Sequence, residues 1–160
     1  MHLFIDADGS PRGYLAWYNH STQSNLIRSI RPETRNGRFG VQRMEMLAIY
    51  FAIVDNIPIF RSRIRKKRIV TGMRRKRNIV VSIRSASKST VEQLKGTCDI
   101  RDKMLFRICE RIGRLLKSIS CNVAFNYVKR TNNKTGLLLE RKAKNKTRSG
   151  KGMIVWYKTN

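Results

Sequence analysis

The fold of this chain is constrained most by a helical run over 41–56, VQRMEMLAIYFAIVDN. After Met44 the run is apolar on nearly every side, which is typical of a helix buried within a fold. Its longest apolar stretch, MLAIYFAIV (46 to 54), is too short to cross a bilayer. With 160 residues the chain is long enough to build one domain around such a helix.

Strand-like segments precede this helix. HLFID (2 to 6), YLAWYN (14 to 19) and LIRSIR (26 to 31) are separated by polar turns that contain Gly, Ser or Asn. Short apolar runs joined by such turns predict a three-stranded antiparallel meander. The chain therefore begins with a sheet, against which the helix is expected to pack.

Strands and helices alternate after the helix. The segment NIVVSI (78 to 83) is a continuous apolar strand, as found inside parallel sheets, and NVAFNYVKR (122 to 130) is a further strand. Helices are predicted over 84–96, 99–120 and 135–146. The order predicts an α/β fold with a mixed five-stranded sheet, in which strands 1–3 are antiparallel and strands 4 and 5 are parallel.

The balance of charge determines which partners are expected. There are 35 Lys and Arg against 10 Asp and Glu, which gives a formal net charge of +25 and a pI of about 11.2. Self-repulsion of this size opposes a compact state unless a polyanion neutralises it. Since the charge is not confined to one amphipathic helix, nucleic acid is expected in preference to a membrane surface, and no small-molecule substrate or cofactor is expected.

Two segments concentrate the positive charge. RSRIRKKRIVTGMRRKR (61 to 77) is predicted to form a basic insertion, part of it a two-stranded extension with its tip at Thr71-Gly72, and the second segment lies near the C-terminus. Trp156 and Tyr157 in the last residues either stack on unpaired bases or complete the core. The cations expected to contact RNA phosphates are Arg61, Arg63, Arg65, Lys66, Lys67, Arg68, Arg74, Arg75, Lys76, Arg77, Arg141, Lys142, Lys144, Lys146, Arg148 and Lys151.

Three acidic residues are candidates for chemistry. Asp6 ends the first strand in LFIDADGS, where a carboxylate is well placed to hold a divalent cation. Asp8 is interpreted as the first residue of an Asp-Gly turn, with a metal ligand on the same strand face as the alternative. Glu45 lies in the apolar helix and is either buried against a cation or several donors, or exposed in the first turn.

Four segments in order resemble the ribonuclease H-like family. LFIDADGSPRGYLAWY is similar to its first hairpin, VQRMEMLAIYFAI to its first helix, NIVVSIRSASKSTVEQLKG to its next strand and helix, and NVAFNYVKRTNNKTGLLL to its last strand and final helix entry. The resemblance covers roughly residues 2–143 without the insertion. It implies a ribonuclease H-like domain over 1–143, with the basic insertion 61–77, and a basic and aromatic extension over 144–160.

The resemblance also implies a set of site residues. The family's reaction uses two Mg²⁺ ions about 4 Å apart, held by four carboxylates. Asp6 matches the first ligand and Glu45 the second, whereas the third and fourth positions hold Arg84 and Leu137. Asn133 keeps the family's identity, and no histidine follows residue 20. A guanidinium at position 84 repels a metal ion and is expected to form a salt bridge with Asp6 and Glu45 instead.

These departures predict a protein without catalytic residues, metal or cofactor. We expect a structural RNA-binding protein, a ribosomal or ribosome-associated component in the cytoplasm that binds ribosomal RNA and contacts neighbouring ribosomal proteins. Three widely spaced cysteines favour reduced thiols in the cytosol, and the early first strand leaves no room for a signal peptide. The alternatives are an active ribonuclease H that uses Asp6, Asp8 and Glu45 around one ion, and a DNA-binding accessory factor.

Overall fold

The described strands form one mixed sheet. The structure, a computed structural model, describes residues 2–71, 79–119 and 121–148, although not the side chains of 65–71 and 145–148. The strand order is β3-β2-β1-β4-β5. The strands β1 (His2–Gly9), β2 (Tyr14–Asn19) and β3 (Ser24–Ser29) are antiparallel, and β4 (Val80–Ser85) and β5 (Asn122–Tyr127) run parallel to β1. The predicted α/β architecture is thus confirmed.

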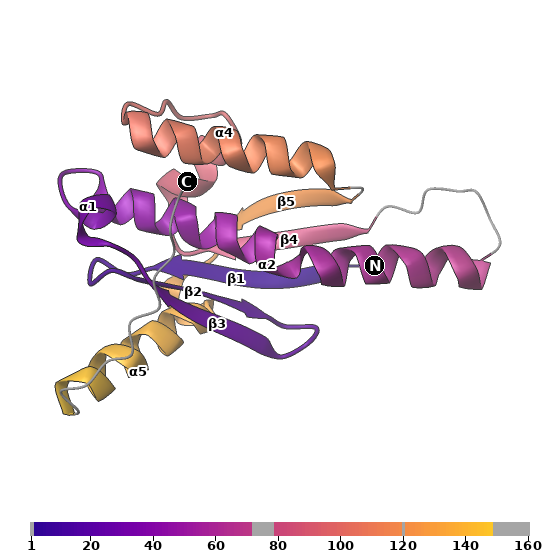
Figure 1. Cartoon of the computed structure of the whole chain (residues 1–160), viewed down its shortest axis with the longest axis horizontal. Helices are drawn as coiled ribbons and strands as arrows, with labels where there is room; N and C mark the ends of the chain where they lie inside the picture. Colours follow the sequence, from indigo (N-terminus) through magenta and orange to yellow (C-terminus); the bar gives the residue numbers. More distant parts are fainter. Residues whose placement is uncertain (1, 72–78, 120, 149–160) are drawn as a thin grey trace.

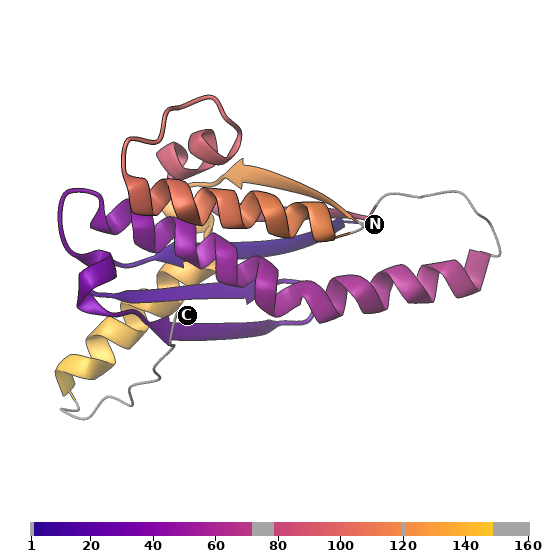
Figure 2. The same cartoon turned by 45° about the horizontal axis from the view of Figure 1, so that its top comes forward.

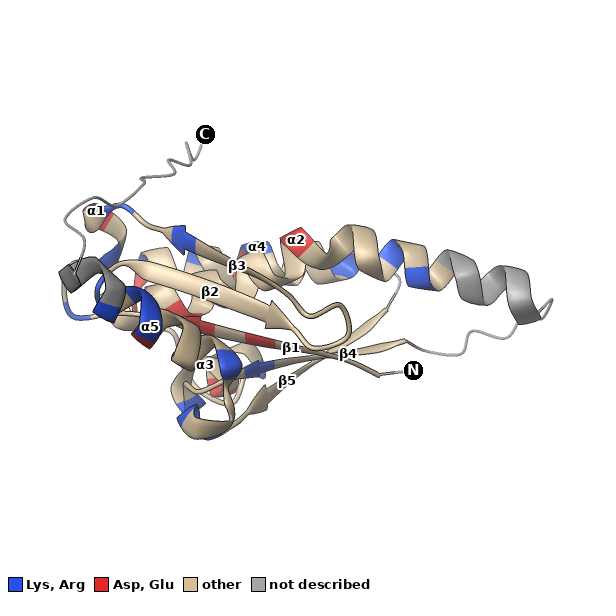
Figure 3. Ribbon diagram, turned by 90° about the horizontal axis from the view of Figure 1, so that it is seen from below, with Lys and Arg blue, Asp and Glu red and all other residues tan. Residues whose placement is uncertain are grey.

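Helices cover both faces of this sheet. The long helices α2 (Gly40–Thr71) and α4 (Lys103–Ser118) lie together on one face, and α5 (Lys134–Arg148) crosses the other face (Figures 1 and 3). The remaining helices are short: α1 (Pro32–Arg35), α3 (Lys88–Leu94) and the 3-10 turn η1 (Arg130–Asn132). The main core lies between the sheet and the pair formed by α2 and α4.

Alternation along the strands and the apolar surface of α2 explain this core. Leu3, Ile5 and Ala7 point from β1 toward α2 and are fully buried. The first half of α2 contributes buried residues on several sides, as its sequence predicts: Met44, Met46, Ala48, Ile49, Ala52 and Ile53. Gly9 allows the close approach, since a Cβ there would lie 2.4 Å from the backbone carbon of Met44. The start of α2 is therefore pressed against the end of β1.

Two ion pairs hold α2 in place. The Arg43 guanidinium donates to both oxygens of Asp102, the N-cap residue of α4, at 2.8 and 2.6 Å. Further along, Asp55 accepts from Arg28 on β3, whose guanidinium also lies 4.6 Å from the centre of the Phe51 ring. Both pairs are largely shielded from solvent, so they fix α2 relative to α4 and to β3 more firmly than surface pairs would.

The basic insertion begins as a helix. The predicted helix end at 56 and the two-stranded extension are wrong for the described residues, because α2 continues to Thr71. Pro58 removes one backbone hydrogen bond, but no other breaker follows before Gly72, and Lys and Arg are good helix formers. Figure 2 shows the second half of α2 projecting beyond the sheet. The cations from Arg74 to Arg77 lie outside the described residues.

The basic C-terminal segment also begins as a helix. Arg141, Lys142 and Lys144 are exposed on α5, which runs to Arg148. The predicted strand or aromatic anchor, with Lys151, Trp156 and Tyr157, lies outside the described residues. Among the helices that the structure describes, none has an apolar stretch long enough for a membrane span.

Candidate functional site

Asp6 is a fully buried carboxylate that joins three parts of the chain. Its Oδ1 accepts from Arg84 Nε at 2.6 Å, and its Oδ2 accepts from the backbone N–H of Lys134 at 2.9 Å. Arg84 lies beside it because Asp6 and Arg84 are register partners in the parallel pair of β1 and β4. Lys134 is the first residue of α5, where a carboxylate also meets the positive end of the helix dipole. Asp6 therefore ties β1 to β4 and to α5.

His20 completes this cluster in one of two ways. Its Nε2 lies 2.9 Å from Asp6 Oδ2 and 2.7 Å from Arg84 Nη2. A carboxylate only accepts and a guanidinium only donates, so this nitrogen satisfies one neighbour at a time. With a proton on Nε2 it donates to Asp6, and without one it accepts from Arg84.

The predicted salt bridge is therefore only half right. Arg84 pairs with Asp6, but no contact among the described residues joins Arg84 to Glu45. Glu45 accepts instead from the Thr90 hydroxyl at 3.1 Å, and Ser87, the N-cap residue of α3, also hydrogen-bonds to it. Burial raises the pKa of Glu45, while the hydrogen bonds from Ser87 and Thr90 oppose that rise. Of the two interpretations of Glu45, the partly buried one with donors holds.

Asp8 is not a turn residue, contrary to the sequence-based interpretation. The strand β1 continues to Gly9, and Asp8 pairs with Ala16 of β2. Its side chain is 3% exposed, Oδ1 accepts from the Gly9 N–H at 2.9 Å, and Oδ2 has no partner among the described residues. Burial raises the pKa of Asp8 to about 6, the nearby charge of Glu45 adds to the rise, and that of Arg130 opposes it. Asp8 and Glu45 are thus neighbouring carboxylates, each with a pKa raised mainly by burial.

The first turn of α5 contributes no acid to this pair. A Cβ at Gly136 would lie 3.3 Å from Asp8 Oδ2, so Gly136 is a position that faces Asp8. Leu137, the predicted position of the lost ligand, is 48% exposed. Asn133 is buried and donates to the carbonyl oxygen of Ala7 at 3.3 Å, which holds the start of α5 on β1.

The positions of Asp6, Asp8 and Glu45 determine which kind of metal centre these residues could form. No group of three or more His, Cys, Asp or Glu side chains that could hold a metal exists among the described residues. A centre of two ions held by four carboxylates does not fit them, since Asp6 is committed to Arg84. Asp8 and Glu45, with one buried oxygen lacking a partner, fit at most a single divalent cation.

Among the residues whose side chains the structure describes, the cations predicted to bind RNA lie in two separate regions. Arg61 is exposed and Arg63 partly exposed where α2 leaves the sheet, whereas Arg141, Lys142 and Lys144 lie on α5. Figures 1 and 2 place the projecting half of α2 and the helix α5 at opposite ends of the sheet. The carboxylates Asp8 and Glu45 lie at the α5 end, because β1 ends there.

Comparison with known proteins identifies the fold. No family model matches this sequence, and no curated protein matches it significantly. Ribonuclease H1 from the halophilic archaeon Halobacterium salinarum superposes with a TM-score of 0.61 at 19% identity, covering 87% of this chain and 94% of that one. LC11-RNase H1 in complex with an RNA/DNA hybrid gives 0.63 at 17% identity, covering 92% and 99%. The RNase H domain of a Mycobacterium tuberculosis protein gives 0.57 at 16% identity, covering 84% and 92%.

These likenesses establish the fold of the chain. The chain has the ribonuclease H-like α/β fold, with the mixed sheet and flanking helices that the resemblance implies. At identities below 20% the likeness carries the fold, and the residues at the site carry any argument about activity.

The Asp6–Arg84 pair is expected to stabilise the fold measurably. Arg84→Met removes a donor from a fully buried carboxylate and should lower the free energy of unfolding by about 3 kcal/mol. Adding Asp6→Asn to that variant should restore part of the loss, because no unpaired charge then remains buried. Urea denaturation at pH 7 measures both. Lys88→Met, which removes an exposed ion pair with Glu92, is the control and should change stability by less than about 0.5 kcal/mol. Equal small effects of Arg84→Met and Lys88→Met would contradict this expectation.

Asp8 is expected to make stability depend on pH. Because its pKa is about 6 in the folded chain and 3.8 as the ordinary value, the folded state binds the proton more tightly. The protonated Asp8 therefore contributes about 3 kcal/mol to the free energy of unfolding relative to its ionised form. This contribution is fully present below about pH 4 and is lost as the pH rises through 6. Asp8→Asn should be more stable than the native chain at pH 7.5 by an amount of that order and nearly equal to it at pH 4. Asp99→Asn, an exposed acid, controls for the lost negative charge. The same pH profile in both variants would show that burial of Asp8 is not the cause.

Proposed function

We propose that this chain is a nucleic-acid-binding protein of ribonuclease H-like fold that binds RNA without cleaving it. The observation that carries the proposal is that Asp6 is bound to Arg84. This leaves Asp8 and Glu45 as the shielded carboxylates at the site, since the nearby Glu140 is exposed and paired with Arg130. Phosphodiester cleavage by two metal ions requires more acidic ligands than this pair supplies. The fold then contributes shape and charge rather than chemistry.

The partner is RNA. A net charge of +25 favours a polyanion, and the structure of LC11-RNase H1 holds an RNA/DNA hybrid on the same fold. Basic segments that extend beyond a folded core are the means by which ribosomal proteins reach into folded RNA. The projecting half of α2 and the exposed cations of α5 match that pattern, so the proposed ligand is ribosomal RNA, bound in the cytoplasm beside neighbouring ribosomal proteins.

A metal-dependent ribonuclease H is the second candidate. It is favoured by the unpartnered Asp8 Oδ2 beside Glu45, because a buried carboxylate oxygen without a donor is a place for a cation. In this candidate Asp8 and Glu45 hold one divalent ion, which would polarise the phosphate. The solved structures with this fold include ribonucleases H1, which is consistent with it.

An assay on an RNA/DNA hybrid separates the two candidates. Purified protein with Mg²⁺ or Mn²⁺ is expected to bind a labelled hybrid without cleaving it. The amount of intact hybrid should then be the same with the native protein and with Asp8→Asn. Cleavage that is lost in Asp8→Asn but kept in Asp99→Asn would establish the second candidate.

The same protein, tagged and expressed in cells, tests the partner. It is expected to sediment with a ribosomal subunit in a lysate at moderate salt. If the protein binds RNA in vitro but sediments apart from ribosomes, the proposed RNA binding stands and the proposed association with ribosomes is wrong.

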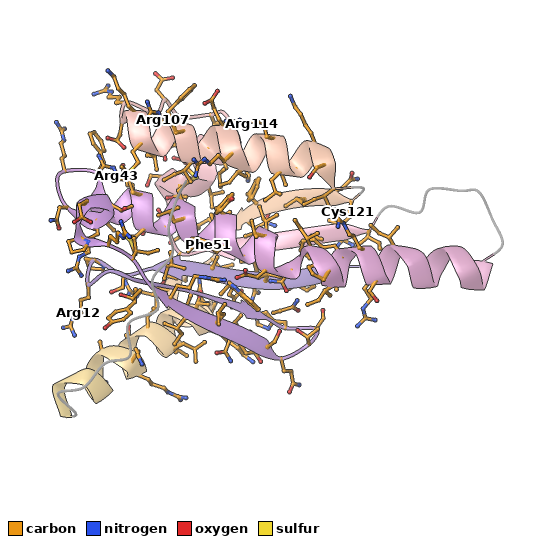
Figure 4. All side chains as sticks on the ribbon, viewed as in Figure 1. Arg12, Arg43, Phe51, Arg107, Arg114 and Cys121 are labelled. Carbon is orange, nitrogen blue, oxygen red and sulfur yellow. The ribbon has the colours of Figure 1, made fainter. Side chains whose placement is uncertain are left out.

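The projecting half of α2 is expected to carry much of the RNA affinity. Substituting Gln for Arg65, Lys66, Lys67 and Arg68 should reduce the slope of log K against log salt by up to about 3–4, since each released phosphate contact contributes about 0.9. The matched control places Gln at four cations of α4: Lys103, Arg107, Arg111 and Arg114. Arg107 and Arg114 lie on the side of α4 that faces away from the sheet (Figure 4). Equal slope changes in the two variants would show that total charge, and not the α2 projection, determines binding.

A further inference from the structure

One face of the sheet is only partly covered. On the side away from α2, the helix α5 packs over β1 and β2 at one end, and β1, β4 and β5 continue past it (Figure 3). The strand register places the residues of this open face side by side: His2, Phe4 and Asp6 on β1; Val80, Ser82 and Arg84 on β4; Asn122, Ala124 and Asn126 on β5. This open face is the strongest feature that the proposed function does not yet use.

An exposed aromatic ring lies on this face. Phe4 is 42% exposed, and its ring lies parallel to that of the exposed His2, with centroids 6.2 Å apart and planes at 18°. The Arg84 guanidinium carbon lies 5.8 Å from the centroid of the Phe4 ring. A single exposed aromatic residue needs no explanation, but two stacked rings beside a guanidinium form a flat apolar surface with a positive border. Bases stack on such surfaces.

Arg84 is held in a fixed orientation on this face. Its Nε donates to Asp6, and its Nη2 lies 2.7 Å from His20 Nε2. Nη1 has no partner among the described residues and is left to contact a phosphate. Lys134 adds a second cation nearby, with Nζ 4.7 Å from the centre of the Tyr18 ring.

A polar group beside the rings adds hydrogen-bonding capacity. The exposed Asn126 donates from Nδ2 to the Ser82 hydroxyl at 2.6 Å, which fixes the amide. Its Oδ1 has no partner within the described part of the chain and can accept from the edge of a base. The open face thus combines a stacking surface, a phosphate donor and a base-edge acceptor.

We propose that this open face binds single-stranded nucleic acid, with one base stacked on Phe4 and its phosphate at Arg84. Charge complementarity and the stacked rings select this occupant, since bases in a duplex are already stacked on one another and only unpaired bases can lie flat on a sheet. Phe4 and Asp8 are four positions apart on β1, which corresponds to about 13 Å along the strand. The inference rests on the proposed nucleic-acid binding, but it holds whether or not the site cleaves.

Binding of labelled oligonucleotides to the full chain tests this proposal. Phe4→Ala should weaken binding of a single-stranded oligouridine roughly tenfold, within the range expected for loss of one base–aromatic stack. It should change the affinity for a duplex of the same length by less than about twofold and leave the salt slope unaltered, because no phosphate contact is removed. Phe4→Trp keeps a stacking ring and should retain the affinity. The control is Phe106→Ala, which removes a 52% exposed ring on α4 and should alter neither affinity.

The outcomes separate this proposal from the function on which it rests. A native chain that binds neither ligand overturns both. If the native chain binds both ligands and Phe4→Ala has the same affinity for the single strand as the native protein or Phe106→Ala, only the proposal of a single-strand surface is overturned. Dimerisation in sedimentation equilibrium that disappears in Phe4→Ala would assign the open face to a second copy of the chain and overturn the proposal. Circular dichroism and thermal unfolding of each variant establish that the fold is intact.

Discussion

The buried carboxylate of Asp6 is the constraint on which the arrangement of the site depends. A carboxylate without exposed surface requires donors, because an unpaired charge in the interior is very costly. Arg84 on β4 and the first backbone N–H of α5 supply them. Since both donors belong to elements far along the chain, Asp6 fixes where β4 and α5 meet β1. That position of α5 in turn brings Gly136 next to Asp8.

Two acids two residues apart on one strand have therefore acquired different properties. Asp6 is neutralised by a guanidinium and serves the structure, whereas Asp8 is buried without a directly bound cation, so burial raises its pKa and the nearby charge of Glu45 adds to the rise. The difference comes from the neighbouring strands and helices, since Arg84 of β4 and the start of α5 supply donors to Asp6, whereas Gly136 of α5 supplies none to Asp8. A centre held by four carboxylates would need each of them free to bind a metal, and here Asp6 is already paired with Arg84.

The sequence predicted the fold because its signals were local and mutually consistent: a helix apolar on all sides, three strands before it and two after it. It did not predict that β1 continues through Asp8, because the Asp-Gly-Ser signal for a turn is overridden by pairing with β2 on one side of β1. It assigned Arg84 to Glu45 as well as to Asp6, because the sequence does not show that Glu45 of α2 meets the hydroxyl groups of Ser87 and Thr90 at the start of α3. The helical part of 61–71 was missed because scattered Ile and Val residues favour a strand while the surrounding Lys and Arg favour a helix.

The distribution of charge restricts the size of the ligand. Arg61 and Arg63 belong to the second half of α2, and Arg141 and Lys142 belong to α5. Figure 2 shows these two helical segments at opposite ends of the sheet. The eight residues of β1 alone span about 26 Å between these ends, well beyond the Debye length of about 8 Å at physiological salt. A single phosphate therefore cannot interact with both basic regions at once, and a mononucleotide is too small to reach from one to the other. The nucleic acid proposed as the ligand must accordingly be a polymer or a folded molecule that extends from one end of the sheet to the other.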